Sequence, residues 1–449
     1  MANSSELHHL SDKDPHGRLA IQSSAVTRFG RLVMSAGAGA YRTKASMSRV
    51  AAAVGIERQH SEIFMQDVIT TSYANGTFRT SMAEHRGIGV NVDRLELLNR
   101  IVAKLKPNTL AEDLEEQMDE IEAKPHLYTP LILALASGIA CAGFSFLNGG
   151  GPVECFAVSI GAFFGQLLRS FVLRKHMNHF GVWMLCAFVA ATIYISIVAL
   201  LWTLGFASHS HQAGFISSIL FLIPGFPMVT AMLDFFRGDY LSGITRGTYV
   251  VMVMLSAGIS VWLVAYLFDW QVAVDYTISL PYWALIVGRM LATYIAVFGF
   301  AMLFNTPLWI AALASSIPVV TNVGRLVMAD NGIPAPLAVF LASLGVGLFV
   351  AAVSRVLKCS RVALSVPAVV IMIPGVPFYR SITTLNPSAQ EAAINWYGTV
   401  GPLFQVAFTV LAIGIGLALA RMLTDYNWAF ETWEHKTPDL TDDTHAPVR

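Results

Sequence analysis

Two copies of one proline–glycine motif lie inside long apolar stretches of this chain, where such a motif could form a binding site. They read Ile223-Pro224-Gly225-Phe226-Pro227 and Ile373-Pro374-Gly375-Val376-Pro377. Proline removes a helix hydrogen bond and glycine loosens the backbone, so each motif should break its helix. Inside a bilayer, freed amides and carbonyls are tolerated only where they are buried in protein or line a wet cavity, and there they can hold a carboxylate and an ammonium group. The predicted binding residues are therefore Pro224, Gly225, Pro227, Pro374, Gly375 and Pro377.

The alternative for these motifs is that both only kink helices for packing. Four further polar residues in apolar surroundings join the prediction, because Arg or Asp at the centre of a bilayer costs about 2.5–3.5 kcal/mol. Glu154 could bind and release a proton, with Asp234 next in line; the alternatives are a helix-start acid and an interfacial cap. Arg289 could hold a carboxylate or pair with Glu154, against a structural partnership with backbone carbonyls. Asn305, which ends a repeated motif, completes the predicted binding set.

No motif of an enzyme accompanies these residues. The chain contains no phosphate loop, no nucleophile–base set and no zinc-protease pattern, and its cysteines have neither metal-knuckle nor redox-pair spacing. We expect no catalytic activity, no metal and no cofactor. The histidines between the predicted spans are interpreted as neutral loop residues rather than a metal site: His176, His179, His209 and His211.

The composition indicates a membrane protein. The 449 residues are 55% hydrophobic and 13% charged, whereas soluble domains carry about a quarter charged residues. The net charge of zero gives no argument for a nucleic-acid partner. Crossing about 30 Å of hydrocarbon takes about 20 apolar residues. Ten spans of near that length are predicted at 128–147, 153–173, 181–207, 214–233, 245–268, 278–304, 307–323, 336–356, 363–378 and 398–421.

Lysine and arginine give the predicted orientation, because they accumulate in cytoplasmic loops. If the N-terminus is inside, the loops assigned to the inside carry eight such residues and those assigned to the outside carry Arg325 and Arg380. The inner set is Arg169, Arg174, Lys175, Arg237, Arg246, Arg355, Lys358 and Arg361. We therefore expect a multi-pass protein of the bacterial inner membrane with both termini cytoplasmic.

Five regions follow along the chain. Residues 1–22 read as a flexible polar start, 23–126 as a cytoplasmic α+β domain, 127–270 and 271–423 as two halves of five spans, and 424–449 as a cytoplasmic polar tail. In the domain, helical periodicity predicts helices at about 24–36, 41–54, 92–104 and 110–123. Asn75-Gly76 between β-branched runs predicts a hairpin. The acidic run from Glu112 to Glu120 is interpreted as a solvated helix face rather than a cation site.

The two halves carry related motifs in the same order. Gly143 to Asn148 before the second span resembles Gly299 to Asn305 before the seventh, and the two proline–glycine motifs fall in the fourth and ninth spans. Arg169 follows Gly143 at the same distance at which Arg325 follows Gly299. Both arginines are interpreted as topology anchors rather than ligands. Duplication of an odd number of spans puts the halves in opposite orientation, as in many secondary transporters. The expected fold is mainly α, with about ten transmembrane helices as two inverted five-helix repeats after a small soluble α+β domain.

These features resemble the threonine/serine exporter family over nearly the whole chain. In the domain the resemblance rests on residues 31–38, 50–56 and 95–105, and in the membrane part on Gly149-Gly150-Gly151-Pro152, Ile223-Pro224-Gly225, Asn305-Thr306-Pro307 and Ile373-Pro374-Gly375. It implies proton-coupled export of small hydrophilic metabolites, typically threonine and serine. Some relatives carry the halves on separate chains and resemble a succinate exporter.

Three hypotheses for the function therefore stay open. The first is a proton-driven exporter of threonine, serine or similar amino acids. The second is a dicarboxylate exporter, which the sequence does not separate from the first because both substrates carry a carboxylate. The third is a membrane-anchored enzyme or sensor acting through the N-terminal domain, although ten spans with internal symmetry exceed what an anchor needs. The expected partners are the metabolite, protons and lipid, and a homo-oligomer is compatible with the sequence.

Overall fold

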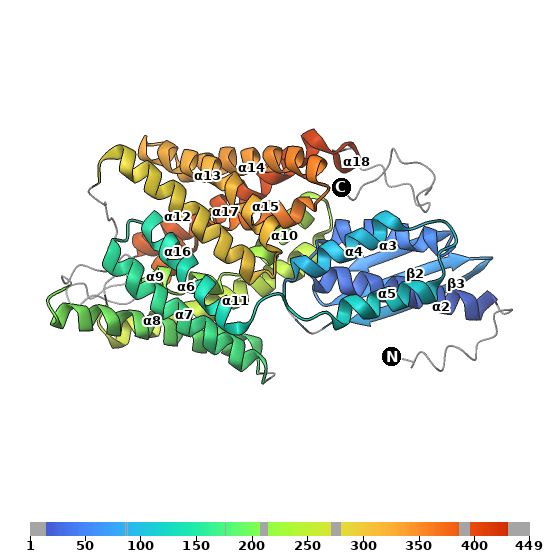
Figure 1. The fold of residues 1–449 in the computed structure, drawn as a ribbon, viewed down its shortest axis with the longest axis horizontal. Coiled ribbons are helices and arrows are strands. Elements are labelled where there is room, and N and C mark those ends of the chain that lie inside the picture. Colours follow the sequence, from blue (N-terminus) through green and yellow to red (C-terminus); the bar gives the residue numbers. More distant parts are fainter. Residues whose placement is uncertain are drawn as a thin grey trace.

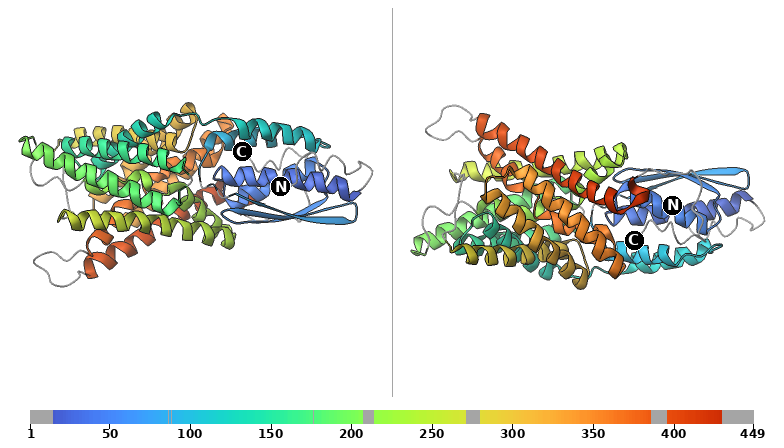
Figure 2. Two further views of the ribbon diagram at one scale, coloured as in Figure 1. Left: turned by 90° about the horizontal axis from the view of Figure 1, so that it is seen from below. Right: turned by 90° about the horizontal axis from the view of Figure 1, so that it is seen from above.

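The computed structural model describes residues 15–85, 87, 89–175, 177–206, 214–270, 280–385 and 396–429. Within these ranges the chain forms two parts, an N-terminal α+β domain and a bundle of long helices, which lie end to end (Figure 1). Views from below and above show the same arrangement (Figure 2). The end of the bundle that contacts the domain is named the proximal end, and the opposite end is the distal end. The mainly helical fold with a small sheet near its start agrees with the prediction.

The N-terminal domain combines four helices with a three-stranded sheet. Its elements in chain order are α2 (Pro15–Ser35), α3 (Ala40–Ala53), β1 (Arg58–Ile63), β2 (Asp67–Ala74), β3 (Thr77–Glu84), α4 (Val92–Lys104) and α5 (Ala111–Ala123). The sheet is antiparallel in the order β1-β2-β3. Asn75 and Gly76 both have positive φ (50° and 72°), as a two-residue type I′ turn requires, so the predicted hairpin is confirmed.

The first described helix begins earlier than expected. The sequence analysis assigned residues 1–22 to a flexible start, but α2 begins at Pro15. Leu19 and Ala20 are each only 2% exposed and belong to the apolar part of the domain, so burial supports helix in this polar stretch. Residues 1–14 lie outside the described residues.

The acidic helix α5 is held against α2 by ion pairs. Arg28 contacts Glu115, Asp119 and Glu122, the last at 2.9 Å, and Arg31 contacts Glu122 at 3.0 Å. Within the predicted solvated run from Glu112 to Glu120, Glu115 is partly buried in its ion pair, whereas Asp119 remains 69% exposed as expected. Their charges neutralise the arginines of a neighbouring helix, a long-range pairing that helical periodicity does not reveal.

The bundle contains two successive groups of helices. The first group is α6 (Pro130–Leu147), α7 (Pro152–Leu173), α8 (His179–Thr203), α9 (Gly214–Ser217), η1 (Leu220–Leu222), α10 (Gly225–Phe236) and α11 (Tyr240–Leu267). The second is α12 (Tyr282–Leu303), α13 (Leu308–Asp330), α14 (Ala335–Leu357), α15 (Arg361–Val370), α16 (Gly375–Thr383) and α17 (Trp396–Thr424), followed by the short helix α18 (Tyr426–Ala429).

Eight described helices are long and apolar enough to cross a membrane, and two bent pairs raise the number to ten if each pair is one span. The segment from α9 to α10 bends by 68°, and that from α15 to α16 by 42°. Both bends fall in the fourth position of their group and at the predicted proline–glycine motifs. The predicted breaks are thus present in the structure.

Helix α13 is longer than its apolar stretch. The sequence analysis ended this span at residue 323 and counted Arg325 as a loop residue, whereas the helix continues to Asp330. In the last turns of α13, polar side chains bond to residues of α12. Asn322 donates to Thr293 at 3.0 Å, and Asp330 pairs with Arg289. Because these groups bond to a neighbouring helix, the helix can continue beyond the point where hydropathy falls.

Small residues bring α6 and α12 into close contact. A Cβ atom on Gly143 would lie 2.9 Å from the Ala292 carbonyl oxygen, and one on Gly299 would lie 2.6 Å from that of Ala136. Phe144 and Phe300 meet edge to face, with ring centroids 6.2 Å apart. Positions in the two helix groups that differ by 156 are equivalent, so 143 corresponds to 299, 136 to 292 and 144 to 300. Phe144 contacts its own equivalent. The Gly143–Ala292 contact recurs with the two equivalents exchanged, as Gly299–Ala136. Only glycine permits such close helix crossings.

Candidate functional site

The two proline–glycine motifs adopt the same backbone conformation. Pro224 has φ −78° and ψ 60°, and Pro374 has φ −79° and ψ 56°. In each motif the glycine N–H donates to the isoleucine carbonyl two residues earlier at 2.8 Å, which makes an inverse γ-turn centred on the proline. A three-residue turn replaces the helical hydrogen bonds at this point. The two bends are therefore structural copies of each other, although the residue between glycine and the second proline differs.

The two motifs also lie against each other. A Cβ on Gly225 would meet Val370 Cγ2 at 2.9 Å and Ile373 Cδ1 at 3.0 Å, both from the second broken span. A Cβ on Gly375 would in turn clash with Ile223 Cδ1 of the first. The contact is reciprocal, with each glycine receiving the isoleucine of the other motif. The predicted meeting of the motifs is thus present, while binding of a ligand at this point stays a prediction.

Polar groups near the bends remain available for a ligand. Among the residues that the structure describes, the buried hydroxyls of Ser217, before the first bend, and Tyr379, after the second, have no hydrogen-bond partner. Buried hydroxyl groups nearly always have partners, so such atoms indicate water or a ligand. The sequence analysis missed both residues because isolated hydroxyls in apolar runs give no distinctive pattern. It also missed Trp183, whose indole N–H donates to the Leu222 carbonyl at 2.7 Å, one turn before Gly225.

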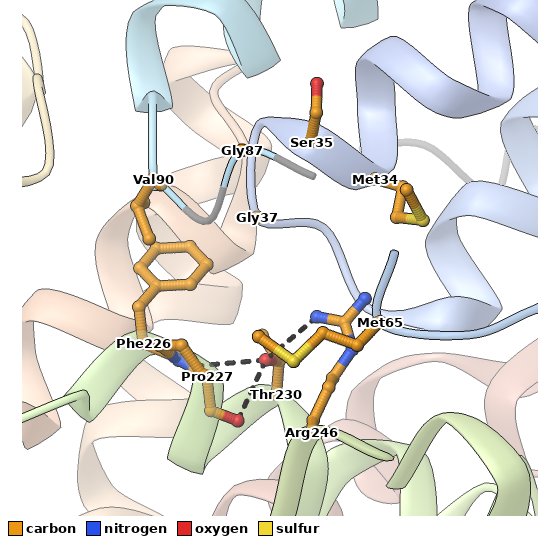
Figure 3. Close-up of a pocket in the computed structure, with 11 residues that line it drawn as sticks. Met34, Ser35, Gly37, Met65, Gly87, Val90, Phe226, Pro227, Thr230 and Arg246 are labelled. Atoms are coloured by element: carbon orange, nitrogen blue, oxygen red, sulfur yellow. Dashed lines mark hydrogen bonds between the residues drawn. The ribbon is translucent and has the colours of Figure 1, made fainter. Parts of the chain in front are cut away.

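A small cavity lies between the first bend and the N-terminal domain (Figure 3). Its volume is about 30 Å³, enough for a water molecule but too small for an amino acid. Arg246 and Thr230 form its polar wall and bond to each other at 3.2 Å, while Phe226 and Pro227 line the membrane side. Residues of the domain close the other side: Met34, Ser35, Gly37, Met65, Gly87, Gly89 and Val90. In this conformation the proximal side of the bend is closed.

A larger hollow of about 720 Å³ opens on the side of the bundle between α6, α7 and α8. Apart from Ser170 and Arg174 near its rim, apolar side chains line it, including Phe164, Phe171 and Ile193. Such walls suit hydrocarbon rather than a hydrophilic solute. It is therefore not the candidate site.

Asp234 lies at the domain interface rather than at the bend. Its Oδ1 accepts from the Ala40 amide at 2.9 Å, at the first residue of α3, and its Oδ2 accepts from Ser242 at 2.8 Å. Arg246 lies 3.4 Å from the same carboxylate and donates to the Ala38 carbonyl at 2.7 Å. Asp234 therefore caps a helix of the N-terminal domain. This geometry matches the interfacial-cap alternative, and the proton-coupling role of Asp234 stays a prediction.

Asn305 also contacts the N-terminal domain, while its predicted part in ligand binding stays a prediction. Its side chain accepts from the Leu127 amide at 2.9 Å and donates to Asn91 at 2.8 Å, while its carbonyl accepts from the Asp93 amide at 3.1 Å. The left-handed conformation (φ 54°) turns these groups toward the domain. The side-chain amide of Asn305 therefore bonds to the domain at the proximal surface.

A third contact joins the domain to the loop before α15. Glu96 Oε1 accepts from the Ser360 amide at 3.1 Å, and Arg42 donates to the Ser360 hydroxyl. Burial raises the pKa of Glu96 above its ordinary value and lowers the pKa of Arg42 to about 10. The predicted tail also contributes: Trp428 of α18 is 2% exposed beside Tyr41, and the residues beyond 429 lie outside the described ranges.

Glu154 and Arg289 do not form the predicted pair. Arg289 pairs with Asp330, one of its two bonds measuring 3.2 Å. Asp330 was missed because the span was ended too early. Glu154 is 3% exposed in the first turn of α7, with Oε2 3.1 Å from the Cβ position of Gly151. A buried carboxylate at the positive end of a helix fits both the proton-carrier prediction and the helix-start alternative.

No group of three His, Cys, Asp or Glu residues in the described ranges is placed to hold a metal ion. His179 begins the α8 helix, accepts or donates a bond with Tyr249 at 2.8 Å and stacks on Trp183. His176, His209 and His211 lie outside the described residues.

Comparison with known proteins supplies the family. Residues 24–268 match the family described as "Putative threonine/serine exporter", and residues 289–423 match "Threonine/Serine exporter". A "Probable threonine/serine exporter" of Mycobacterium tuberculosis is 25% identical over 415 residues, which are 88% of this chain and 75% of that protein. A "Probable succinate transporter subunit" of Escherichia coli is 28% identical over 249 residues, 54% of this chain and 93% of that protein. A protein of the same description from Klebsiella aerogenes is 28% identical over 219 residues, 48% of this chain and 81% of that protein.

No solved structure matches the chain significantly. The two family matches together cover both helix groups and the N-terminal domain, so they apply to the whole architecture rather than to one part. The chain belongs to the threonine/serine exporter family, whose members are membrane transporters and not enzymes.

Proposed function

We propose that this protein is a secondary transporter that uses the proton gradient to export threonine, serine or similar small amino acids across the bacterial inner membrane. The observation that carries the proposal is the reciprocal contact of two helix breaks that share one turn conformation. Broken helices offer free amides and carbonyls, which suit the carboxylate and ammonium of a zwitterion. The Mycobacterium tuberculosis relative, which spans most of the chain, supports an amino acid as the substrate.

The two helix groups act as inverted repeats in this proposal. Each has four long helices and one broken span in the fourth position, and contacts between them exchange equivalent residues, as at Gly143 and Gly299. Such exchange is what a two-fold axis in the membrane plane produces. Alternating access then follows from rocking of one group against the other around the bends.

The orientation follows from the basic loops. Both termini are proposed to be cytoplasmic, with the N-terminal domain and the proximal end on that side. External labelling of single cysteines should reach positions 208 and 271, which lie outside the described residues, and should not reach Lys175→Cys. Labelling of position 175 from outside intact cells would refute this orientation.

The decisive test is transport by the purified full-length protein in proteoliposomes. Threonine, serine and succinate are compared with and without an imposed proton gradient. Threonine movement stimulated by the gradient supports the proposal, and movement of succinate alone favours the dicarboxylate alternative, which the relatives described as succinate transporter subunits suggest. Glu154→Gln keeps the size and removes the titration, so exchange without a gradient should survive better than gradient-driven transport. Equal survival of both activities would exclude Glu154 as the coupling group.

A further inference from the structure

Arg169 and Arg325 lie inside spanning helices and form no ion pair with a carboxylate in the described ranges. Arg246 and Arg289, by contrast, are neutralised by Asp234 and Asp330, and Arg355 near the end of α14 bonds to the Thr424 carbonyl. Arg169 of α7 and Arg325 of α13 bond to neutral side chains. An unneutralised guanidinium in a membrane span is costly and is retained where it has a function. Their interpretation as topology anchors does not explain this, because both lie within helices rather than in loops.

Both arginines have the same local partner. Arg169 donates to the side-chain oxygen of Gln166 at 3.3 Å, and Arg325 donates to that of Asn322 at 2.9 Å. Each amide lies three residues earlier in its helix and is buried, at 5% and 0% exposure. Gln166 and Asn322 are 156 positions apart, as are the two arginines. An amide oxygen orients the guanidinium but leaves its charge uncompensated, and the Nε of Arg169 has no hydrogen-bond partner among the described residues.

Arg169 lies close to the first broken span, and the helix that carries Arg325 packs on the second. Arg169 covers the ring of Trp183 at 4.3 Å, and that indole bonds to the Leu222 carbonyl just before the first bend. Helix α7 packs on α9 and η1, the first segments of that span, and α13 packs in the same way on α15. The ionisable groups that act on Arg169 are Tyr249 and Cys186, and the one that acts on Arg325 is the like-charged Arg289. Among the residues that the structure describes, no carboxylate forms an ion pair with Arg169 or Arg325, and the nearby Asp330 is already paired with Arg289.

The two arginines lie toward opposite ends of the bundle. Arg169 is 17 positions after Pro152, the first residue of α7 at the distal end, and Arg325 is 17 positions after Leu308, the first residue of α13 at the proximal end. At 1.5 Å per residue each is about 25 Å along its helix from that start. Arg169 is therefore on the proximal side of the bends and Arg325 on the distal side.

We infer that Arg169 with Gln166 and Arg325 with Asn322 are two carboxylate-binding stations, one on each side of the bends, which the transported solute occupies in turn. A guanidinium presents paired N–H groups that match a carboxylate in geometry and charge. The carboxylate of the bound solute supplies the negative charge that is missing beside each arginine, so only a solute with a carboxylate binds well. This inference rests on the proposed transport function and adds its requirement: the substrate must carry a carboxylate, whether it is an amino acid or a dicarboxylate.

The test uses sided kinetics of the full-length protein in proteoliposomes of known orientation. Arg169→Lys should raise the KM at least tenfold for threonine presented on the side of the N-terminal domain. The KM for threonine presented on the other side should stay within twofold. The reason is that lysine keeps the positive charge but lacks the paired N–H donors of a guanidinium. Arg325→Lys should give the reverse. Arg355→Lys, at the end of α14, is the matched control and should change neither value. Equal changes on both faces, or none, would overturn the inference.

A second measurement separates this inference from the choice of substrate. Threoninol keeps the side chain and amine of threonine and lacks the carboxylate, so it should neither be transported nor protect the detergent-solubilised protein against heat. Threonine or succinate should protect the wild type against heat. In the double variant Arg169→Lys/Arg325→Lys, the concentration of solute needed for the same protection should be at least tenfold higher. A wild type that carries succinate alone would refute amino-acid export and support the stations. Transport of threoninol as fast as threonine would refute the stations and leave a transporter.

Discussion

The contact between the two bends can be tested by adding one methyl group and removing another. In Gly375→Ala the new Cβ would clash with Ile223 Cδ1 and lie 3.0 Å from Leu220 Cδ2. Overpacking of this kind costs about 1–3 kcal/mol, and because the struck atoms are the ends of flexible side chains we expect about 1–2. Ile223→Val deletes the Cδ1 that the new methyl strikes, at a cost of about 0.5–1.5 kcal/mol on its own.

The double variant Gly375→Ala/Ile223→Val should therefore be more stable than the sum of the two changes, with a coupling of about 1–2 kcal/mol. The measurement is the unfolding free energy of the four proteins in detergent micelles, with threonine transport measured in parallel. Transport should fall in Gly375→Ala and recover in the double variant. Gly401→Ala, where nothing lies within 4 Å of the new Cβ, controls for the substitution itself. Effects that add within about 0.5 kcal/mol would show that the bends do not touch as described.

Two further predictions concern the docking of the N-terminal domain. Asp234→Asn leaves Arg246 as an unpaired buried charge, so it should destabilise the docked state of the domain by about 3–5 kcal/mol. Limited digestion should then cleave the chain in the hinge before α6. Resistance to protease equal to that of the wild type would contradict the prediction. Burial raises the pKa of Glu96, so the docked state binds this proton more tightly than the unfolded state, and its stability should fall as the pH rises from about 4.5 through the raised pKa. Glu96→Gln should flatten that part of the melting-temperature profile between pH 4.5 and 7, and an unchanged slope would assign it to other groups.

The sequence predicted those features that local chemistry determines. Proline followed directly by glycine at Pro224-Gly225 and Pro374-Gly375 favours a break in a helix, and Asn75-Gly76 favours a tight turn, so both features were found. The spans were found because hydropathy is summed over about 20 residues and tolerates single errors.

Features that depend on a distant partner were not predicted. Arg325 was assigned to a loop because hydropathy falls before it, and only the bonds of Asn322 and Asp330 to the distant helix α12 explain why the helix continues. Asn305 and Asp234 have the residue types of a binding site, but their partners come from the N-terminal domain, up to about two hundred positions away in the chain. A polar residue in an apolar run therefore indicates that it has a partner and does not tell whether that partner is a ligand or another domain.

The N-terminal domain bonds to both helix groups, and this limits how the bundle can move. It contacts the first group through Asp234 of α10 and the second through Asn305 after α12 and Ser360 before α15. Rocking of one group against the other must break one of these sets, and each hydrogen bond contributes about 0.5–1.5 kcal/mol, with more for those to a charge. The closed cavity beside Pro227 lies at this junction, with the domain forming one wall. In the proposed rocking mechanism, opening the proximal side of the bends therefore requires the domain to leave one group, so the strength of its docking would set the cost of that step.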